Sequence, residues 1–387
     1  MPKNIVICAD GTGNEIKENL SNVLKLYRIL EKNGQQVCFY DPGVGTISNS
    51  DAWSRLKHKA KGVFGLATGY GLDANVLDSY RFLVRNYRDG DQIYLFGFSR
   101  GAYTVRVLAG FLNLVGLVQP EQEHLTSCAL TAYKQASNQD DFRIAWRVQR
   151  VLETRRVTIH FMGCWDTVGT VIIPRPDRLY LIPSLETLPY TKTNPCVRAF
   201  RHAIAIDERR RMFRLSTWTE PQKFKTNPFV KDEDAAEQDI EQVWFAGVHS
   251  DIGGGYPETQ SGLAKIPLDW MIDEAEKHGL ICHESRRRRY VQGDNPRNST
   301  RVYVAPNPEG MLHDSITGAW PVLEWLPKRA TRIEWHERKA ALGVYLPRSE
   351  PRPIPPDATI HPSVGERKRS RISPTYNPVN LPPGPPL

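Results

Sequence analysis

Short apolar segments alternate along this chain with segments in which apolar residues recur every three or four positions. A short, nearly continuous apolar run is typical of a strand buried on both faces, whereas the longer recurrence is typical of a helix with one buried face. Strands that alternate with helices favour an α/β fold with a mainly parallel central sheet. The pattern predicts strands at 4–9, 36–40, 92–96, 157–162 and 243–248, and helices at 15–32, 76–87 and 102–117.

A single large domain accounts for most of the 387 residues. Hydrophobic residues make up 40% of the chain, enough for a substantial core, which excludes wholesale disorder. We predict one α/β domain over 1–340, with insertions at about 44–72 and 119–155. Residues 341–387 hold 12 of the 29 prolines. We expect this Pro-rich C-terminal segment to pack on the domain or to extend from it.

A serine lies between the third predicted strand and the helix that follows it, in the pattern Gly97-x-Ser99-x-Gly101. On such a strand-to-helix turn the hydroxyl stands at the carboxyl end of the sheet, and the next backbone N–H, that of Arg100, can face a developing oxyanion. The position therefore predicts Ser99 as a nucleophile. The alternative is a tight packing turn with a capping serine.

A nucleophilic serine needs a base, and the base needs an acid that orients it. In α/β-hydrolases the order along the chain is Ser, then Asp or Glu, then His. Two later strands end in suitable residues, Asp166 and His249, and strand ends at the carboxyl edge of a sheet converge in space. His313 is the second candidate for the base. His249 alternatively is a hydrogen-bonded structural residue of its loop.

Other polar residues near strand ends have supporting roles in this scheme. Asp251 lies two residues after the candidate base, so we expect it to shape the loop through a local turn. Asp10 follows the first strand, and we expect it to brace that loop. Gly11 or Thr12 would then supply the second N–H of the oxyanion hole.

Metal and nucleotide sites have weaker support. Asp10, Asp166, His249 and Asp251 can be drawn together as the ligands of a metal-assisted phosphoesterase, although nothing in their spacing requires a metal. The glycines near residue 11 lack the third glycine of a dinucleotide loop, and no Gly-Lys-Ser/Thr motif is present. The six cysteines include no Cys-x-x-Cys pair, so neither a zinc site nor a disulfide framework is indicated. We expect no cofactor.

Four longer motifs resemble those of one known family. They are CADGTGN (8–14), YLFGFSRGAY (94–103), CWDTVG (164–169) and GVHSDIGGGY (247–256), with shorter matches at 202–203, 207–209 and 360–364. The chain resembles, from residue 4 to about 382, an α/β-hydrolase family of uncharacterised domains in bacteria and fungi. This family includes the type VI secretion phospholipase effectors, the Tle-type lipases.

The resemblance implies an α/β-hydrolase fold with helical insertions and a C-terminal wrap. It also implies Ser99 as nucleophile, Asp166 as acid and His249 as base, and a docked rather than a free Pro-rich segment. The expected function is hydrolysis of carboxylic esters by a serine esterase or lipase, with phospholipase A action on membrane lipids as the family's activity. A non-catalytic hydrolase-like scaffold is the alternative outside enzyme chemistry.

The chain is basic, with 51 Lys and Arg against 43 Asp and Glu and a net charge of +8. No nucleic-acid-binding motif accompanies the arginines, so we expect no nucleic-acid partner. An anionic membrane surface suits the charge better, although solvated faces would also account for it. A candidate interfacial patch or lid, which could equally be core, consists of Trp320, Leu323, Trp325 and Leu326, close to Lys328.

Neither a membrane span nor a secretory signal peptide is predicted. The longest apolar stretch, 105–118, contains Arg106 and Asn113, and a span needs about 20 nearly uninterrupted apolar residues. The N-terminus runs straight into the first strand without a cleavage site. We therefore expect a cytoplasmic location or export by a route that needs no signal peptide.

Overall fold

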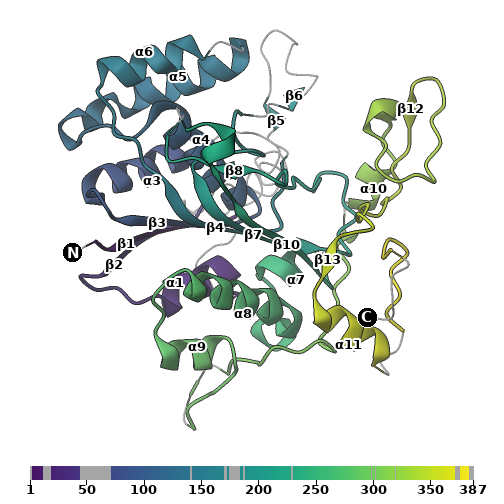
Figure 1. Ribbon diagram of the computed structural model, residues 1–387. Coiled ribbons are helices and arrows are strands. Elements are labelled where there is room, and N and C mark those ends of the chain that lie inside the picture. Colours follow the sequence, from purple (N-terminus) through teal and green to yellow (C-terminus); the bar gives the residue numbers. More distant parts are fainter. Residues whose placement is uncertain are drawn as a thin grey trace, which may run out of the picture.

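Seven strands form the central sheet of the structure, a computed structural model (Figure 1). Every pair of neighbouring strands in this sheet runs parallel, and helices lie on both of its faces, which confirms the predicted α/β class. The described residues are 2–11, 19–43, 71–139, 142–169, 172–173, 184–185, 188–227, 230–297, 299–300, 302–318, 320–370 and 375–382.

The order of strands across the sheet is β13-β10-β7-β4-β3-β1-β2. The five predicted strands all form, with ends that differ from the expected ones by a few residues. Their carboxyl ends share one edge of the sheet because the strands are parallel. The strands are β1 (Asn4–Ala9), β2 (Gln36–Asp41), β3 (Gln92–Phe98), β4 (Ile159–Trp165), β7 (Val197–Ala205), β10 (Asp239–Phe245) and β13 (Thr359–Ile360).

Strand β7 was not predicted, because charged residues interrupt its apolar pattern. Arg201 lies buried in it, where its Nε is 2.8 Å from Glu274 Oε2 and its NH1 is 2.9 Å from Asp239 Oδ1. His202 is also buried, and its Nε2 accepts the N–H of Thr167 at 3.1 Å. Partners distant in the sequence therefore satisfy polar groups that the local pattern places outside a core.

Two apolar cores lie on the two faces of the sheet. In β1, Ile5 and Ile7 face the first core, whereas Val6 and Cys8 face the second, as the alternation of side chains along a strand requires. Figure 1 shows α3 to α6 over one face and α1 and α7 to α9 over the other. These helices are α1 (Asn22–Ile29), α3 (Leu72–Asn86), α4 (Arg100–Val115), α5 (Thr126–Gln139), α6 (Arg143–Val151), α7 (His249–Gly253), α8 (Gly262–Lys277) and α9 (Glu284–Tyr290).

The Pro-rich C-terminal segment contributes the last strand of the sheet. In β13, Thr359 pairs with Val243 and Ile360 pairs with Trp244. A third apolar cluster joins this segment to β7 and β10 through Ile354, which packs near Trp244. The helix α11 (Pro362–Arg369) follows β13, while α10 (Trp320–Glu324), β11 (Lys328–Arg329) and β12 (Val344–Tyr345) form a lobe at the side of the sheet (Figure 1).

The two predicted insertions differ in what the structure describes. Residues 44–70, nearly all of the first one, lie outside the described residues. The second, at about 119–155, contains α5 and α6. The division into a domain and a C-terminal segment stays a prediction. The remaining short elements are β5 (Ile172–Ile173), β6 (Ser184–Leu185), β8 (Lys223–Phe224), β9 (Ala236–Glu237), and the 3₁₀ helices η1 (Pro120–Leu125), η3 (Asp232–Asp234), η4 (Glu258–Gln260) and η5 (Ala330–Arg332).

None of the helices in the described part of the chain is long and apolar enough to cross a membrane. The most apolar of them, α4, carries Arg106 fully buried. This guanidinium donates to the carbonyl of Ser216 at 2.8 Å and lies 5.1 Å from the centre of the Phe200 ring.

The buried Arg201 provides a test of how β7 is held. We expect Arg201→Met to lower the free energy of unfolding by about 3 kcal/mol, because it removes the buried cation from Glu274 and leaves this carboxylate paired with the exposed Lys277 alone among the described residues. The exposed pair of Arg81 and Asp78 is the control, since Arg81→Met should change stability by less than about 1 kcal/mol. Urea unfolding of both variants measures the difference, and equal losses would contradict this account.

Candidate active site at the carboxyl edge of the sheet

Ser99 occupies a strained turn between β3 and α4. Its φ is 59° and its ψ is −119°, in a region that residues with a side chain rarely adopt. Its N–H donates to the carbonyl of Trp165, at the end of the neighbouring strand β4, at 3.1 Å. Within α4, which is described throughout, no N–H is capped by the Ser99 side chain. The strained turn is compatible with a nucleophile elbow, and the missing cap hydrogen bond does not fit the alternative of a capping serine.

The two glycines of the motif are required by close packing. A Cβ on Gly101 would lie 2.0 Å from the carbonyl oxygen of Ala9, and a Cβ on Gly97 would lie 2.5 Å from the N of Ala102. Both distances are far shorter than any real contact of a Cβ. The elbow therefore sits directly against the end of β1, and only glycine permits this approach.

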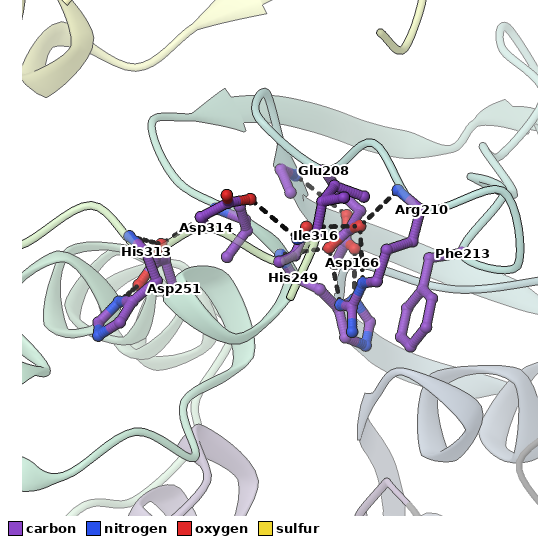
Figure 2. A network of polar contacts seen from close by, with 12 residues as sticks. Asp166, Glu208, Arg210, Phe213, His249, Asp251, His313, Asp314 and Ile316 are labelled. Atoms are coloured by element: carbon purple, nitrogen blue, oxygen red, sulfur yellow. Dashed lines mark hydrogen bonds and ion pairs between the residues drawn. The ribbon is translucent and has the colours of Figure 1, made fainter. Parts of the chain in front are cut away.

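Asp166 and His249 lie at the ends of two other strands and bond to each other. Asp166 follows β4 directly, with a positive φ of 37°, and His249 begins α7 just after β10. The distance from His249 Nδ1 to Asp166 Oδ2 is 2.5 Å (Figure 2). Both side chains are buried. In the register of the sheet, Phe98 pairs with Trp165, so Ser99 and Asp166 follow paired positions on adjacent strands.

The ring of His249 packs between two aromatic rings. The ring of Phe98, the residue before Ser99, lies 4.6 Å away between centroids, and that of Phe213 lies 4.8 Å away, edge to face. The pKa of His249 is lowered by burial, which the hydrogen bond and charge of Asp166 oppose. Among the described residues, no hydrogen bond joins His249 to Ser99. In ligand-free enzymes this bond is often long and tightens when substrate binds.

Two charged residues that were not among the candidate site residues contact Asp166 and His249. Arg352 places NH1 at 2.6 Å from Asp166 Oδ1 and NH2 at 3.1 Å from Asp166 Oδ2. Burial alone would raise the pKa of Asp166, but Arg352 and His249 outweigh it and hold that pKa well below its ordinary value. Arg352 belongs to the Pro-rich segment, and no local motif marks it.

Glu208 is the second of these residues. Its Oε2 accepts the backbone N–H of His249 at 3.1 Å and pairs with Arg210 at 2.8 Å (Figure 2). Burial would raise the pKa of Glu208, but the pairing with Arg210 lowers it. Glu208 lies within one of the shorter motifs of the resemblance, which is the signal that could have identified it.

Asp251 lies to one side of Asp166 and His249, beside the second candidate base, His313 (Figure 2). Its Oδ2 accepts the N–H of Val248 at 3.1 Å, which is the geometry expected of a residue that shapes this loop. Its Oδ1 lies 2.6 Å from His313 Nδ1, and His313 Nε2 lies 3.2 Å from Gln260 Oε1. Both ring nitrogens of His313 are thus engaged, so His249 is the better candidate for the base.

The first loop differs from its predicted role at one position. Asp10 braces the loop as expected, since Asp10 Oδ1 accepts the N–H of Gly11 at 2.7 Å and Oδ2 accepts the Tyr40 hydroxyl at 2.9 Å. The N–H of Gly11 is therefore directed at Asp10, and the prediction of Gly11 as an oxyanion donor is not supported. Thr12 lies outside the described residues. Arg100 is the first residue of α4, so its N–H follows the elbow directly.

The four residues of the metal-site alternative do not form one ligand set. Asp166 pairs with His249 and Arg352, Asp251 pairs with His313, and Asp10 belongs to the loop after β1. Across the ranges that the structure describes, no group of three or more His, Cys, Asp or Glu is arranged to hold a metal ion. Arg352 already supplies the positive charge beside Asp166.

A family model decides where this chain belongs. The model of the catalytic domain of Tle1-like phospholipase effectors of the type VI secretion system (T6SS) matches residues 3–274. The chain belongs to this Tle1-like family. The match contains Ser99, Asp166 and His249, together with Glu208. Arg352 lies beyond it.

Three individual proteins are similar to this chain, and in each of them the match covers only part of the protein's length. An uncharacterized protein of Saccharomyces cerevisiae, YEL023C, is 32% identical over 232 residues, which are 56% of this chain and 33% of the yeast protein. The chain thus matches about a third of that relative's length. A crystal structure of an uncharacterized protein from Pseudomonas aeruginosa is 19% identical with a TM-score of 0.41, and covers 74% of this chain and 47% of that one. The Tle1 effector bound to the VgrG spike is 19% identical with a TM-score of 0.32, and covers 68% and 52%.

The contact of Gly101 with β1 provides a test of the elbow. We expect Gly101→Ala to destabilise the protein by about 1 to 3 kcal/mol, because the added methyl group overlaps the Ala9 carbonyl. Gly34→Ala is the matched control, since nothing lies within 4 Å of a Cβ at that position. Thermal unfolding compares the two variants. A Gly101→Ala protein as stable as the control would contradict the packing described here.

Proposed function

We propose that this chain is a serine hydrolase of carboxylic esters, with Ser99 as nucleophile, His249 as general base and Asp166 as the acid that orients it. The observation that carries the proposal is the 2.5 Å contact of His249 Nδ1 with Asp166 Oδ2, at the sheet edge where Ser99 stands on its strained turn. The contact leaves Nε2 of His249 as the nitrogen that faces away from Asp166. This arrangement supports the assignment of a Ser-His-Asp triad.

The reaction begins when His249 Nε2 takes the proton of the Ser99 hydroxyl while Oγ attacks the ester carbonyl carbon. The tetrahedral intermediate carries its negative charge on the former carbonyl oxygen, which the N–H of Arg100 stabilises. The intermediate collapses, the alcohol leaves with the proton from His249, and an acyl group remains on Ser99. A water molecule, activated in turn by His249, then hydrolyses this acyl-enzyme. Asp166 stays ionised throughout and stabilises the imidazolium that forms on His249.

Membrane phospholipids are the proposed substrate class, with phospholipase A cleavage of their acyl esters. Membership of a family described by its phospholipase effectors supports this choice. The non-catalytic scaffold is the alternative, and it predicts that Ser99 does not react. A fluorophosphonate probe distinguishes the two, because it labels a serine only when the serine is activated by its base.

An anionic membrane surface is the proposed partner, through the lobe formed by α10, β11 and β12. Trp320 does not belong to the exposed patch, since its ring packs 5.7 Å from that of Phe213 beside His249. The side chain of Leu323 lies outside the described part of the lobe. Trp325 and Leu326 are 59% and 50% exposed. The other exposed apolar residues of the lobe are Val322, Leu342 and Val344, and exposed cations are Arg329, Arg332, Lys339 and Arg348.

The triad is tested by removing its members one at a time. We expect Ser99→Ala and His249→Gln each to lower kcat for a soluble p-nitrophenyl ester by about 10⁴-fold or more, because the nucleophile or its base is lost. His313→Gln is the matched histidine control and should keep kcat within a few-fold. Activity that survives Ser99→Ala, or that is lost only with His313→Gln, would overturn the assignment.

The membrane surface is tested by vesicle flotation. We expect Trp325→Asp with Leu326→Asp to abolish most binding to phosphatidylcholine vesicles that contain phosphatidylglycerol, because the apolar contact is replaced by negative charge. Trp146→Asp is the control, since Trp146 is similarly exposed, at 58%, on α6. Turnover of a soluble ester should stay unchanged in both variants. Equal binding by both would remove this lobe as the docking surface.

A further inference from the structure

We propose that Arg352, carried by the Pro-rich C-terminal segment, is a positioning residue of the triad, whose guanidinium fixes the Asp166 carboxylate in the orientation that His249 needs. The inference rests on the proposed function. It adds a fourth side chain, from a part of the chain beyond the family match at 3–274. Arg352 does not touch the reacting atoms, so its effect passes through Asp166.

The guanidinium is held in place on both of its sides. NH1 and NH2 each contact one oxygen of Asp166, at 2.6 Å and 3.1 Å, which is a bidentate pair. NH1 also donates to the carbonyl of Ala205 at 3.2 Å, and NH2 donates to the carbonyl of Phe213 at 2.8 Å. Arg352 is 5% exposed. The planar guanidinium is thus bonded to two carbonyl oxygens and to both oxygens of Asp166. These contacts leave it one orientation in which its two NH2 groups can pair with the carboxylate.

Arg352 contacts both carboxylate oxygens of Asp166, and each oxygen has one further partner. Oδ1 accepts the N–H of Ala205 at 3.0 Å as well as Arg352, whereas Oδ2 receives Arg352 and His249. Without Arg352, the partners left to the buried carboxylate among the described residues would be the Ala205 N–H and the His249 ring. A carboxylate so weakly held can rotate about its χ2 or take up a proton, and either change misdirects the imidazole.

The same arginine balances the charges that face His249. Asp166 approaches from the end of β4 and Glu208 from the loop after β7, and both are negative. Arg352 pairs with Asp166 and Arg210 pairs with Glu208, so each carboxylate has its own cation. The rings of Phe98 and Phe213 contribute no charge. His249 is thus kept in surroundings with little net charge, where burial favours the neutral imidazole that a base requires.

The fold delivers Arg352 through the docking of the C-terminal segment. The carbonyl of Arg352 accepts Asn380 Nδ2 at 3.0 Å, and the same nitrogen reaches the carbonyl of Ile206 at 3.0 Å. Ile354 packs in the apolar cluster with Trp244, and β13 pairs with β10. The strap formed by residues 351–370 therefore ties the triad acid to β10, alongside which it adds β13 as the edge strand of the sheet.

The test replaces Arg352 and follows the pH dependence of turnover. We expect Arg352→Met to lower kcat for a soluble ester by about 100-fold, with little change in KM, because the substrate does not touch this residue. The base acts only when neutral, and loss of the arginine charge raises the pKa of His249. The acidic limb of kcat/KM should therefore move upward by about one pH unit.

Arg367→Met is the matched control. Arg367 is also a 5% exposed arginine of the same segment, but it bonds to the carbonyls of Pro308 and Gly310 and does not contact the triad. Arg352→Met should lose more stability on thermal unfolding than Arg367→Met, because it leaves the Asp166 carboxylate without its cation. Turnover is therefore compared at a temperature at which both variants are folded, where only Arg352→Met should lose turnover and shift the pH profile. Arg352→Lys, which keeps the charge but not the fork, should recover part of kcat and return the acidic limb to its original pH.

Chemical rescue provides a second test, which separates a loss of positioning from poor folding of the variant. Guanidinium added at millimolar concentration to Arg352→Ala should restore turnover, whereas an equal concentration of sodium chloride should not. Full kcat and an unshifted limb in Arg352→Met, or equal losses in the Arg367 control, would overturn the positioning role. If Ser99→Ala retained activity, the proposed function itself would fail, and the two failures are therefore distinguishable.

Discussion

A negative charge buried at the edge of a parallel sheet is the constraint around which this site is built. Asp166 is fully buried, so its carboxylate can stay ionised only if partners replace the water that it has lost. Those partners come from three separate stretches of chain, the Ala205 N–H, the His249 ring and the Arg352 guanidinium. The charge thus makes strand β7, the loop after β10 and the C-terminal segment depend on one another.

The parts of the site that follow from strand order could be predicted from the sequence. Ser99, Asp166 and His249 each come directly after an apolar run, and parallel strands bring such positions to one edge. No contact between side chains had to be known for that step. The same reasoning placed Asp10 in its bracing position, because the residue follows the first strand immediately.

The parts that depend on pairing between distant residues could not be predicted. Arg201 and His202 make β7 look polar until Glu274 and Thr167 are known to lie against them. Arg352 lies in a proline-rich stretch whose composition resembles a free tail. Gly11 is a different case. The sequence places it in the loop after the first strand, but the direction of its N–H depends on the contact with Asp10. Orientation and charge compensation are properties of the assembled fold.

The edge position of β13 bears on how this site comes into being. A chain leaves the ribosome from its N-terminus, so Asp166 and His249 are made well before the segment that carries β13 and Arg352. During that interval Arg352 is not yet available to pair with the carboxylate. The described contacts of Asp166 are therefore complete only once the late segment has joined β10, so the candidate site depends on the last part of the chain to be synthesised.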